Sequence, residues 1–401
     1  MVIVQKYGGS SLASIEKIKY VAKKVIAKKR AGNKVVVIVS AMGDTTDKLI
    51  EMTKRITQDP DKRELDRLLS TGEQVSSALL SITIKSMGEE SVSFTGPQVG
   101  IATTDTYTNA RILSIDSKKI IDALNDDKIV VIAGFQGVSH NGDITTLGRG
   151  GSDTSAVAVA ASLGAKCEIY TDVDGIYTAD PRKVNNPKKL SRISYDAILE
   201  LASLGAKVMH SRSIEIAKKF NVEVYVASTF SNEKGTVITK EDEMERMVIT
   251  GITSNEKEVK ITVYNLPVKS KALSRLFGKI SSSNVNVDMI SETAISQGSF
   301  NCSFTVPAGE MLTVRKSLEE FKNEFKDVRY VIDKDIVKIS VVGVGMRSHP
   351  GVAAKVFEAL EEENIEIQMI TTSEIRISCI IKKEYEKLAL NKIAEEFNLT
   401  E

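Results

Sequence analysis

Two kinds of apolar pattern alternate along the first 230 or so residues of the chain. Short continuous apolar runs are typical of buried parallel strands, and longer segments with apolar residues every three or four positions are typical of helices. Five strands are predicted in this way, at residues 2–4, 35–39, 129–133, 167–170 and 222–226. Strands that alternate with helices predict an open α/β fold with a mostly parallel sheet.

The pattern changes after a charged stretch at residues 233–246. Residues 259–263 read VKITV and residues 337–341 read VKISV, and Met289 and Ile290 recur 80 positions later as Met369 and Ile370. Each copy predicts a strand, a loop, an amphipathic helix and a strand, without groups that suggest catalysis. The duplication therefore indicates a pair of binding modules. The apolar stretch at 248–253 is expected to join the second copy in space.

Polar loops that contain glycine follow four of the predicted strands, and ligands of open α/β sheets bind outside the carboxyl ends of the strands. The first loop reads Lys6-Tyr7-Gly8-Gly9-Ser10-Ser11 and leads from a strand into a helix. Its amides and Lys6 suit a phosphate, although a tight turn with a surface lysine is the alternative. Neither the P-loop nor the dinucleotide-binding motif occurs in the chain.

A second candidate loop, residues 147–155, reads LGRGGSDTS and precedes an Ala/Val run predicted to form a buried helix. Ser152 or Asp153 would cap this helix, and its glycines would place amides around an anion. An ordinary glycine turn fits the local pattern equally well. Glu73 opens another predicted helix and is expected to face a cation, the alternative being a first-turn glutamate favoured by the helix dipole.

Charge and cysteine content narrow the functional classes. With 54 basic and 53 acidic residues the net charge is +1, so no overall field favours nucleic acid or an anionic membrane. The three cysteines are far apart, which fits reduced, buried thiols, and the histidines show no metal-ligand spacing. The N-terminus lacks a signal-peptide pattern, and no apolar run reaches the roughly 18 residues of a membrane helix, so we expect a cytoplasmic protein.

Taken together, these segments resemble the aspartate kinase family within the amino acid kinase superfamily. The matching stretches are residues 6–11, 40–47, 71–73, 148–153 and 171–182. The resemblance covers essentially the whole chain and implies an amino acid kinase-like open α/β/α sandwich in residues 1–245. Two ferredoxin-like (βαββαβ) ACT domains are implied at residues 246–332 and 333–401, and whether they share the first strand stays open.

The resemblance implies transfer of the γ-phosphoryl of ATP, with Mg²⁺, to the β-carboxylate of L-aspartate, the first step of lysine, threonine and methionine biosynthesis. A carboxylate is already ionised at neutral pH, so the site needs alignment and charge neutralisation rather than a general base. The implied residues are Lys6, Asp153 and Lys207 for catalysis; Ser40, Thr46, Glu73, Arg149 and Ser152 for aspartate; and Lys6, Gly8, Gly9, Ser10, Thr171, Asp172, Tyr177, Arg182 and Lys207 for the nucleotide. The resemblance gives no protein ligand of Mg²⁺.

Within this set, Arg149 is expected to pair with a carboxylate of aspartate, Glu73 to receive its α-ammonium, and Asp153 to organise the lysines. Another amino acid kinase, such as one acting on glutamate, and a non-catalytic sensor with an inactive kinase fold are the alternatives. Comparing the phosphorylation of aspartate and glutamate separates these alternatives.

By the same resemblance, the ACT pair binds lysine, threonine or both and forms a homodimer or a higher oligomer. The implied effector-binding residues are Met289, Ile290, Glu292, Thr372, Ser373 and Glu374. The first copy has Val268-Lys269-Ser270-Lys271 where the family usually shows Asp-x-Pro-Gly. This departure removes an acidic partner for an effector's ammonium and leaves the effector open.

Overall fold

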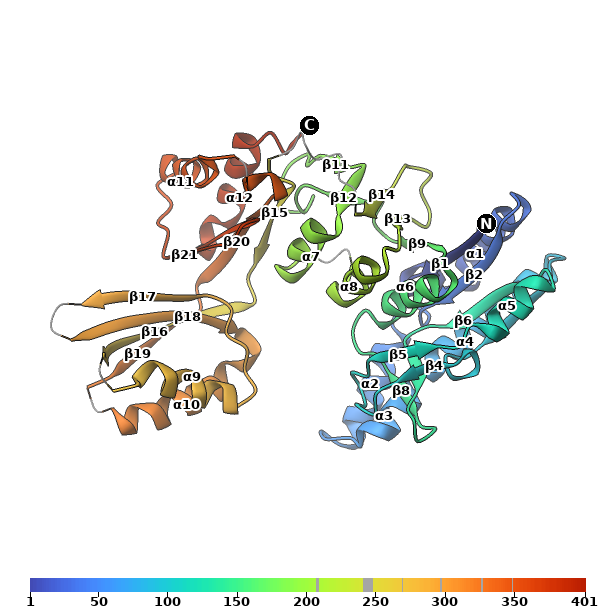
Figure 1. Ribbon diagram of the computed structural model, residues 1–401, viewed down its shortest axis with the longest axis horizontal. Helices are drawn as coiled ribbons and strands as arrows, with labels where there is room; N and C mark the ends of the chain where they lie inside the picture. The colour runs from blue at the N-terminus through green and yellow to red at the C-terminus, as the bar shows by residue number, and fades with distance from the viewer. Residues whose placement is uncertain (207–208, 241–247, 269, 296–297, 326, 348) are drawn as a thin grey trace. The chain divides into compact units, whose positions relative to one another are not determined.

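The computed structural model describes residues 1–401 except 207–208, 241–247, 269, 296–297, 326 and 348 (Figure 1). The chain divides into two compact units, which are described separately. The first unit comprises Met1–Ile176, Lys189–Ala202 and the described part of Lys207–Glu243. The second comprises Tyr177–Lys188, Ser203–Ala206 and the described part of Met244–Glu401. The expected domain boundaries after residues 245 and 332 stay predictions.

An eight-stranded sheet forms the centre of the first unit, in the order β12-β14-β13-β9-β1-β2-β6-β3. All neighbouring strands are parallel except β13 and β14, so the sheet is mostly parallel, as predicted. The strands are β1 (Val2–Tyr7), β2 (Lys34–Val39), β3 (Ser91–Phe94), β6 (Ile129–Ala133), β9 (Lys166–Thr171), β12 (Arg192–Ser194), β13 (Val224–Ser228) and β14 (Thr236–Thr239). The five predicted strands are confirmed, and β3, β12 and β14 were not predicted.

Helices cover both faces of this sheet and produce the expected α/β/α sandwich. On one face, α1 (Ile15–Arg30) and α4 (Thr71–Ser86) pack over β2, β3 and β6. On the other face, α6 (Gly151–Leu163) packs over β1, β2 and β9, and α8 (Ser211–Phe220) packs on α6. The remaining helices of this unit are α2 (Thr45–Ile56), α3 (Lys62–Leu69), α5 (Lys118–Asn125) and α7 (Tyr195–Ser203).

The first unit also contains a small sheet in the order β5-β4-β7-β8. Its strands come from the part of the chain between β3 and β9, and its last strand leads into the loop that precedes α6. Its strands are β4 (Ile101–Thr103), β5 (Ile112–Ile115), β7 (Gln136–Val138) and β8 (Ile144–Thr146). A hairpin joins β7 to β8, and β8 leads directly into residues 147–150. The small sheet therefore sets the starting point of the predicted substrate loop.

The second unit contains two four-stranded sheets of similar design. The first module has the sheet β17-β18-β16-β19 with α9 and α10, and the second has β15-β20-β22-β21 with α11 and α12. The bounds are β15 (Gly251–Asn255), β16 (Glu258–Pro267), α9 (Ala272–Ser282), β17 (Ile290–Ile295), β18 (Ser299–Pro307), α10 (Met311–Glu324), β19 (Arg329–Asp333), β20 (Ile336–Val342), α11 (Val352–Glu362), β21 (Met369–Thr372), β22 (Arg376–Lys382) and α12 (Glu386–Glu396).

The two modules are interleaved along the chain. β15 precedes the first module in sequence but pairs antiparallel with β20 of the second. It takes the place beside β20 that β19 takes beside β16 in the first module. Each module thereby gains a complete four-stranded sheet with one face covered by two helices.

A segment from the kinase half of the sequence is built into the second module. Ala179 and Val184 lie in its apolar core. The Thr178 hydroxyl donates to the Leu399 carbonyl at 2.6 Å, and the Lys183 ammonium donates to the Glu386 carboxylate at 2.6 Å. Residues 177–188 are thus part of the second unit, although chain connections at both ends lead to the first unit.

The cysteines are buried and free, as expected from their spacing. No helix in the described part of the chain combines the length and apolar character needed to cross a membrane.

The place of β15 in the second module predicts how a core substitution acts. Ile252 is 2% exposed and packs in the core of this module, so Ile252→Ala should lower the free energy of unfolding by about 2–5 kcal/mol. Ile370, on β21 of the same module, is 43% exposed, and Ile370→Ala should cost less than about 1 kcal/mol. Urea unfolding of both variants measures the difference. Equal losses would contradict the pairing of β15 with the second module.

Candidate active site

Four segments of the first unit meet where β1 and β2 end. They are the glycine turn after β1, the loop after β2, the start of α4 and the start of α6. The amide of Gly43 donates to the Gly9 carbonyl at 3.0 Å. A Cβ on Gly9 would lie 2.8 Å from the Ala41 carbonyl oxygen, and one on Gly72 would lie 2.8 Å from the Ala41 Cβ. The loops approach so closely that only glycine fits at these two positions.

Lys6 and Asp153 form a buried ion pair at this meeting point. Successive side chains of a strand point to opposite faces, and Lys6 faces α6 whereas Tyr7 packs in the core under α1. The Lys6 ammonium lies 2.7 Å from an Asp153 carboxylate oxygen, and about a tenth of either side chain is exposed. Two of the predicted catalytic residues, 147 positions apart in sequence, are therefore in direct contact.

The prediction that Ser152 or Asp153 caps α6 is wrong. The helix begins at Gly151, and Gly150 precedes it with a φ of 67° and no capping side chain. A side chain at position 150 would also collide with His210. Glycine starts the helix because no larger residue fits in this conformation and space, and Asp153 is left to pair with Lys6.

In the predicted phosphate-binding turn after β1, only some of the backbone amides are available to bind a ligand. The Gly8 amide donates to the Tyr170 carbonyl of β9 at 3.2 Å and so ties the turn to the sheet. Gly9 and Ser10 begin a short 3₁₀ helix (Gly9–Leu12), whose first amides have no partner within the helix. The Lys17 ammonium donates to the Ser10 carbonyl at 2.8 Å and adds positive charge beside the turn.

Glu73 is a buried carboxylate with one oxygen unused. The side chain is 4% exposed, and one of its oxygens accepts a hydrogen bond from the Ala41 amide at 3.1 Å. The other oxygen has no hydrogen-bond partner among the described residues. Burial raises the pKa of Glu73 to about 7. A carboxylate in this state gains most from a cationic group placed against its unused oxygen.

Ser40 and Ser152 bring the ends of β2 and α6 together. Their hydroxyl oxygens lie 2.8 Å apart. Thr46 is half-buried in the first turn of α2. These three hydroxyl side chains are at the ends of the segments that surround Lys6 and Glu73.

Arg149 projects from the loop between β8 and α6. It is exposed, and within the described ranges it forms no ion pair or hydrogen bond through its guanidinium. Glycines with positive φ flank it, Gly148 at 77° and Gly150 at 67°. Both flanking residues use backbone conformations that side chains rarely adopt, so the loop presents Arg149 from a fixed, unusual backbone.

The predicted nucleotide residues fall into both units. Thr171 ends β9 and its hydroxyl donates to the neighbouring Asp172 carboxylate at 2.9 Å, in the first unit. Tyr177 and Arg182 belong to the second unit, where the Arg182 guanidinium donates to Asp180 at 2.8 Å. Lys207 lies outside the described residues, as does Lys269.

Comparison with known proteins agrees with this geometry. Residues 1–228 match the amino acid kinase family, and residues 339–397 match the ACT domain. An aspartokinase of Bacillus sp. (strain MGA3) is 45% identical over 400 residues, which cover 99% of this chain and 97% of that protein. The chain belongs to the aspartate kinase family. The aspartokinase of Pseudomonas aeruginosa is 46% identical over 401 residues, with the same two coverages.

Solved aspartate kinases share the fold of the whole chain. The enzyme of Clostridium acetobutylicum is 25% identical with a TM-score of 0.80, and the match covers 99% of this chain and 100% of that one. Aspartokinase III of E. coli, solved with aspartate and ADP, is 22% identical, also with a TM-score of 0.80 and the same coverages. The second comparison supports the fold alone. The family assignment rests on the closer relatives.

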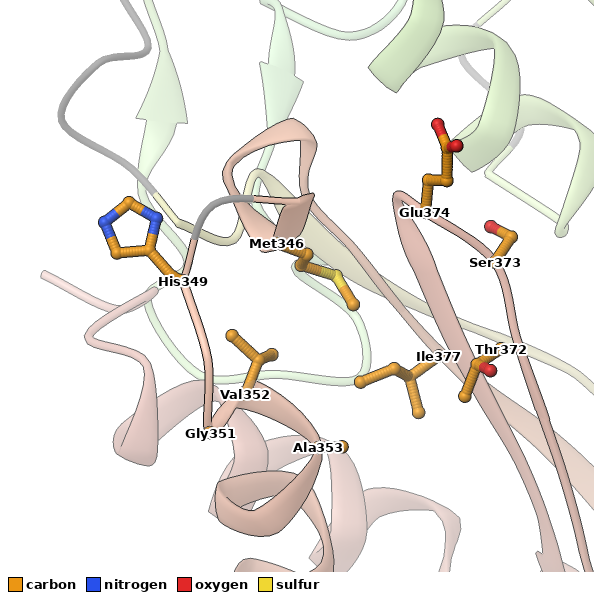
Figure 2. A pocket seen from close by; sticks show the side chains of 9 residues that line it. All are labelled: Met346, His349, Gly351, Val352, Ala353, Thr372, Ser373, Glu374 and Ile377. Atoms are coloured by element: carbon orange, nitrogen blue, oxygen red, sulfur yellow. The ribbon is translucent and has the colours of Figure 1, made fainter.

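The predicted effector residues of this aspartate kinase differ in their surroundings. Thr372, Ser373 and Glu374 line an open pocket of about 740 Å³ in the second module. Figure 2 shows Met346, Val352 and Ile377 around its centre and His349 and Glu374 on its rim; the remaining lining residues are Gly351 and Ala353. The pocket lies between the start of α11 and the β21–β22 connection.

In the first module, Met289 is buried with Ile336, Met369 and Ile380, whereas Ile290 and Glu292 are exposed. Met289 is therefore a core residue where the two modules meet.

Two residues that form hydrogen bonds to the loop carrying Arg149 were not predicted from the sequence. The Asp66 carboxylate, fully buried in α3, accepts hydrogen bonds from Thr146, and the Arg212 guanidinium donates to the Leu147 carbonyl at 2.8 Å. Each bonds to a segment at least 65 positions away. Asp66 had a weak local signal, because it lies three residues before Leu69 and so shares a face of α3 with this apolar residue.

The raised pKa of Glu73 predicts a pH-dependent cost to the fold. The folded state keeps the proton between the ordinary pKa of 4.5 and about 7, so stability falls as the pH rises through this window. Glu73→Gln keeps the shape and the Ala41 contact but never ionises. Its stability relative to the parent should therefore rise by about 2–3 kcal/mol between pH 5 and pH 8.

Urea unfolding without substrate at the two pH values measures this change. Glu51→Gln, at an exposed glutamate of α2 that pairs with Arg55, serves as the surface control. If the difference in free energy of unfolding between Glu73→Gln and the parent does not change with pH, the raised pKa of the buried Glu73 carboxylate is contradicted.

Proposed function

We propose that the site around Lys6 and Asp153 transfers the γ-phosphoryl of ATP to the β-carboxylate of L-aspartate, giving 4-phospho-L-aspartate. Two observations carry this proposal: the buried Lys6–Asp153 ion pair, and the buried Glu73 carboxylate, one oxygen of which has no partner among the described residues. The aspartokinases that match nearly the full chain support the same reaction. The aspartate and ADP in the E. coli aspartokinase III structure support the two substrates.

Two charged side chains and three hydroxyls account for the recognition of aspartate. Glu73 offers its unused oxygen to the α-ammonium group. Arg149, exposed and uncommitted in the described part of the chain, pairs with a carboxylate, for which a planar guanidinium is better suited than an ammonium. The hydroxyls of Ser40, Thr46 and Ser152 complete the pocket, and aspartate is held at both charged ends.

Phosphoryl transfer in this site requires alignment and positive charge. The attacking β-carboxylate is ionised near neutral pH, so no side chain has to remove a proton. Lys6, with the amides of Gly9 and Ser10, neutralises charge on the transferred group, and the family resemblance assigns Lys207 to the phosphates as well. Asp153 holds the Lys6 ammonium in place rather than acting as a base.

Further residues are assigned to the nucleotide. Thr171 ends β9 and Asp172 follows it, and both lie next to the glycine turn, because Gly8 bonds to Tyr170. The assignment of Tyr177 and Arg182, in the second unit, to the nucleotide stays a prediction from the family resemblance. No group of three or more His, Cys, Asp or Glu side chains in the described ranges is arranged to hold a metal. Mg²⁺ would enter with ATP, held mainly by phosphate oxygens and water, and would neutralise phosphate charge.

The competing enzymatic function is phosphorylation of another acidic amino acid. Glutamate is longer by one methylene, and the fixed glycine contacts around Lys6 leave the loops little freedom to adapt. Trapping the acyl phosphate with hydroxylamine, with ATP and either aspartate or glutamate, separates the two. We expect hydroxamate from aspartate alone, and its absence beside an active control enzyme would refute the proposal.

The second module serves as a sensor of an amino acid end product. Its pocket is lined by the start of α11, where Gly351 with a φ of 94° precedes the helix. The lysine in a second E. coli aspartokinase III structure makes lysine a candidate effector, and threonine is the other. Titrating each amino acid into the kinase assay identifies the ligand. Dimerisation through the ACT pair is part of the same proposal.

The first module lacks the glycine at the equivalent position. Lys271, 80 residues before Gly351, precedes α9 with a φ of 54°. A lysine in this left-handed conformation is strained, and its side chain stands where the second module leaves open space. We propose that the first module binds the effector more weakly than the second.

Substitution of Arg149 tests the carboxylate contact. Arg149→Lys keeps the charge but loses the paired hydrogen bonds, so KM for aspartate should rise about tenfold to a hundredfold. KM for ATP should change by less than about twofold. Arg111→Lys, at another exposed arginine of the first unit, is the control. Steady-state kinetics in both substrates measure the effect, and equal increases in both KM values would remove Arg149 from the aspartate site.

Substitution in the pocket tests the sensor. Thr372→Val removes one hydroxyl from the lining and should raise the effector concentration for half-inhibition about fivefold to tenfold, with kcat unchanged. Thr371→Val changes the neighbouring residue of β21, which does not line the pocket, and should leave inhibition as it is. Inhibition curves with the active amino acid decide. An unchanged curve for Thr372→Val would place the effector elsewhere.

A further inference from the structure

Asp66 is a buried carboxylate without a charged partner. It is 0% exposed, and the described residues place no cation within ion-pair distance of it. Its oxygens instead accept hydrogen bonds from the Thr146 amide at 2.8 Å, the Thr146 hydroxyl at 2.6 Å and the Thr108 amide at 2.9 Å. An ionised group in this position is stabilised only by donors that the protein holds in fixed places. Asp66 thus organises two loops.

The first of these loops is strained. Thr108 has a φ of 66°, a conformation that is rare for a β-branched residue and costs on the order of 1–3 kcal/mol. The hydrogen bond from its amide to Asp66 keeps it there. Its carbonyl oxygen faces Gly148, where a Cβ would approach to 3.0 Å. The strained Thr108 therefore packs closely against Gly148, in the loop that carries Arg149.

The second loop is fixed at its first two residues. The Thr146 carbonyl accepts from the Ala110 amide at 2.9 Å, and the Leu147 amide donates to the Phe135 carbonyl at 2.9 Å. Arg212, at the start of α8, donates to the Leu147 carbonyl at 2.8 Å and also to the Ala110 carbonyl. With the Asp66 contacts, every backbone polar group of Thr146 and Leu147 has a partner. The exposed Arg149 follows Leu147 by only two residues.

We propose that Asp66 and Arg212 are positioning residues for aspartate recognition, which hold the loop 146–150 so that Arg149 meets the substrate carboxylate. The proposal rests on the role given to Arg149 under the proposed function. Asp66 acts at Thr146 and through Thr108, and Arg212 acts at Leu147, so the two reach the loop from α3 and from α8. Neither residue touches the substrate. Their loss weakens aspartate binding by letting Arg149 move.

Thr146 offers the mildest test, because its hydroxyl is the shortest contact to Asp66. Thr146→Val keeps the volume and the backbone hydrogen bonds but removes this donor. KM for aspartate should rise about fivefold to twentyfold, and KM for ATP should stay within about twofold. Thr146→Ser restores the hydroxyl and should recover most of the affinity for aspartate. Asp66→Asn, if it folds, should show a larger effect of the same kind.

Thr145 provides the matched control. It is the preceding residue of β8, is equally buried, and shares a hydrogen bond with the Thr103 hydroxyl on the other face of the strand. Thr145→Val should lose thermal stability to a similar degree, yet keep both KM values. An increase in the aspartate KM of Thr145→Val as large as that of Thr146→Val would overturn the proposal, because general loosening would then explain both.

Combining Thr146→Val with Arg149→Ala distinguishes the proposed role of Arg149 from the proposed positioning role of Asp66 and Arg212. Thr146→Val should add less than about twofold to the aspartate KM of Arg149→Ala, since residues that act through one contact are not additive. If Arg149→Ala alone leaves the aspartate KM unchanged, the proposed role of Arg149 fails. If Arg149→Ala raises it but Thr146→Val does not, or raises both KM values equally, the positioning role fails while the proposed function stands.

Discussion

The ion pair between Lys6 and Asp153 is the contact on which the catalytic unit depends. It joins the central strand of the sheet to the helix that covers it, and it can form only if α6 starts on the bare backbone of Gly150 and Gly151. A buried charge that loses its partner is far more costly than a buried pair. The glycines at 9 and 72 let the loops around this pair pack closely on Ala41, and Gly150 lets the start of α6 pack closely on His210.

The sequence was most informative where local pattern decides the structure. Continuous apolar runs identified five strands of the sheet, and the 80-residue repeat identified the two modules. The strands β3, β12 and β14 escaped prediction because each is only three or four residues long and mixes apolar with polar side chains. The family resemblance named Lys6, Glu73, Arg149 and Asp153, and the structure brings Lys6 and Asp153 into contact and buries Glu73 beside Ala41. Their roles stay predictions.

Contacts between segments that are far apart in the chain could not be predicted from the sequence. The cap assigned to Ser152 or Asp153 was wrong because capping propensity is local, whereas the partner of Asp153 comes from the first strand. The Gly8 amide was assigned to phosphate, yet it bonds to Tyr170, a strand neighbour that is 162 positions away in sequence. Asp66 and Arg212 bind carbonyls, amides and a hydroxyl, groups that nearly every segment offers, so no sequence motif marks their partners.

The interleaving of the two ACT modules bears on how the chain folds during synthesis. β15 ends at Asn255, but its partner β20 begins at Ile336, so the whole first module emerges between them. The first module can close its own sheet at once, whereas β15 waits with unpaired amides and carbonyls, a condition that invites association with other chains. Its short length, five residues, limits that hazard until β20 arrives. Completion of the sensor module is then the last folding event, after the kinase unit and the first module have formed.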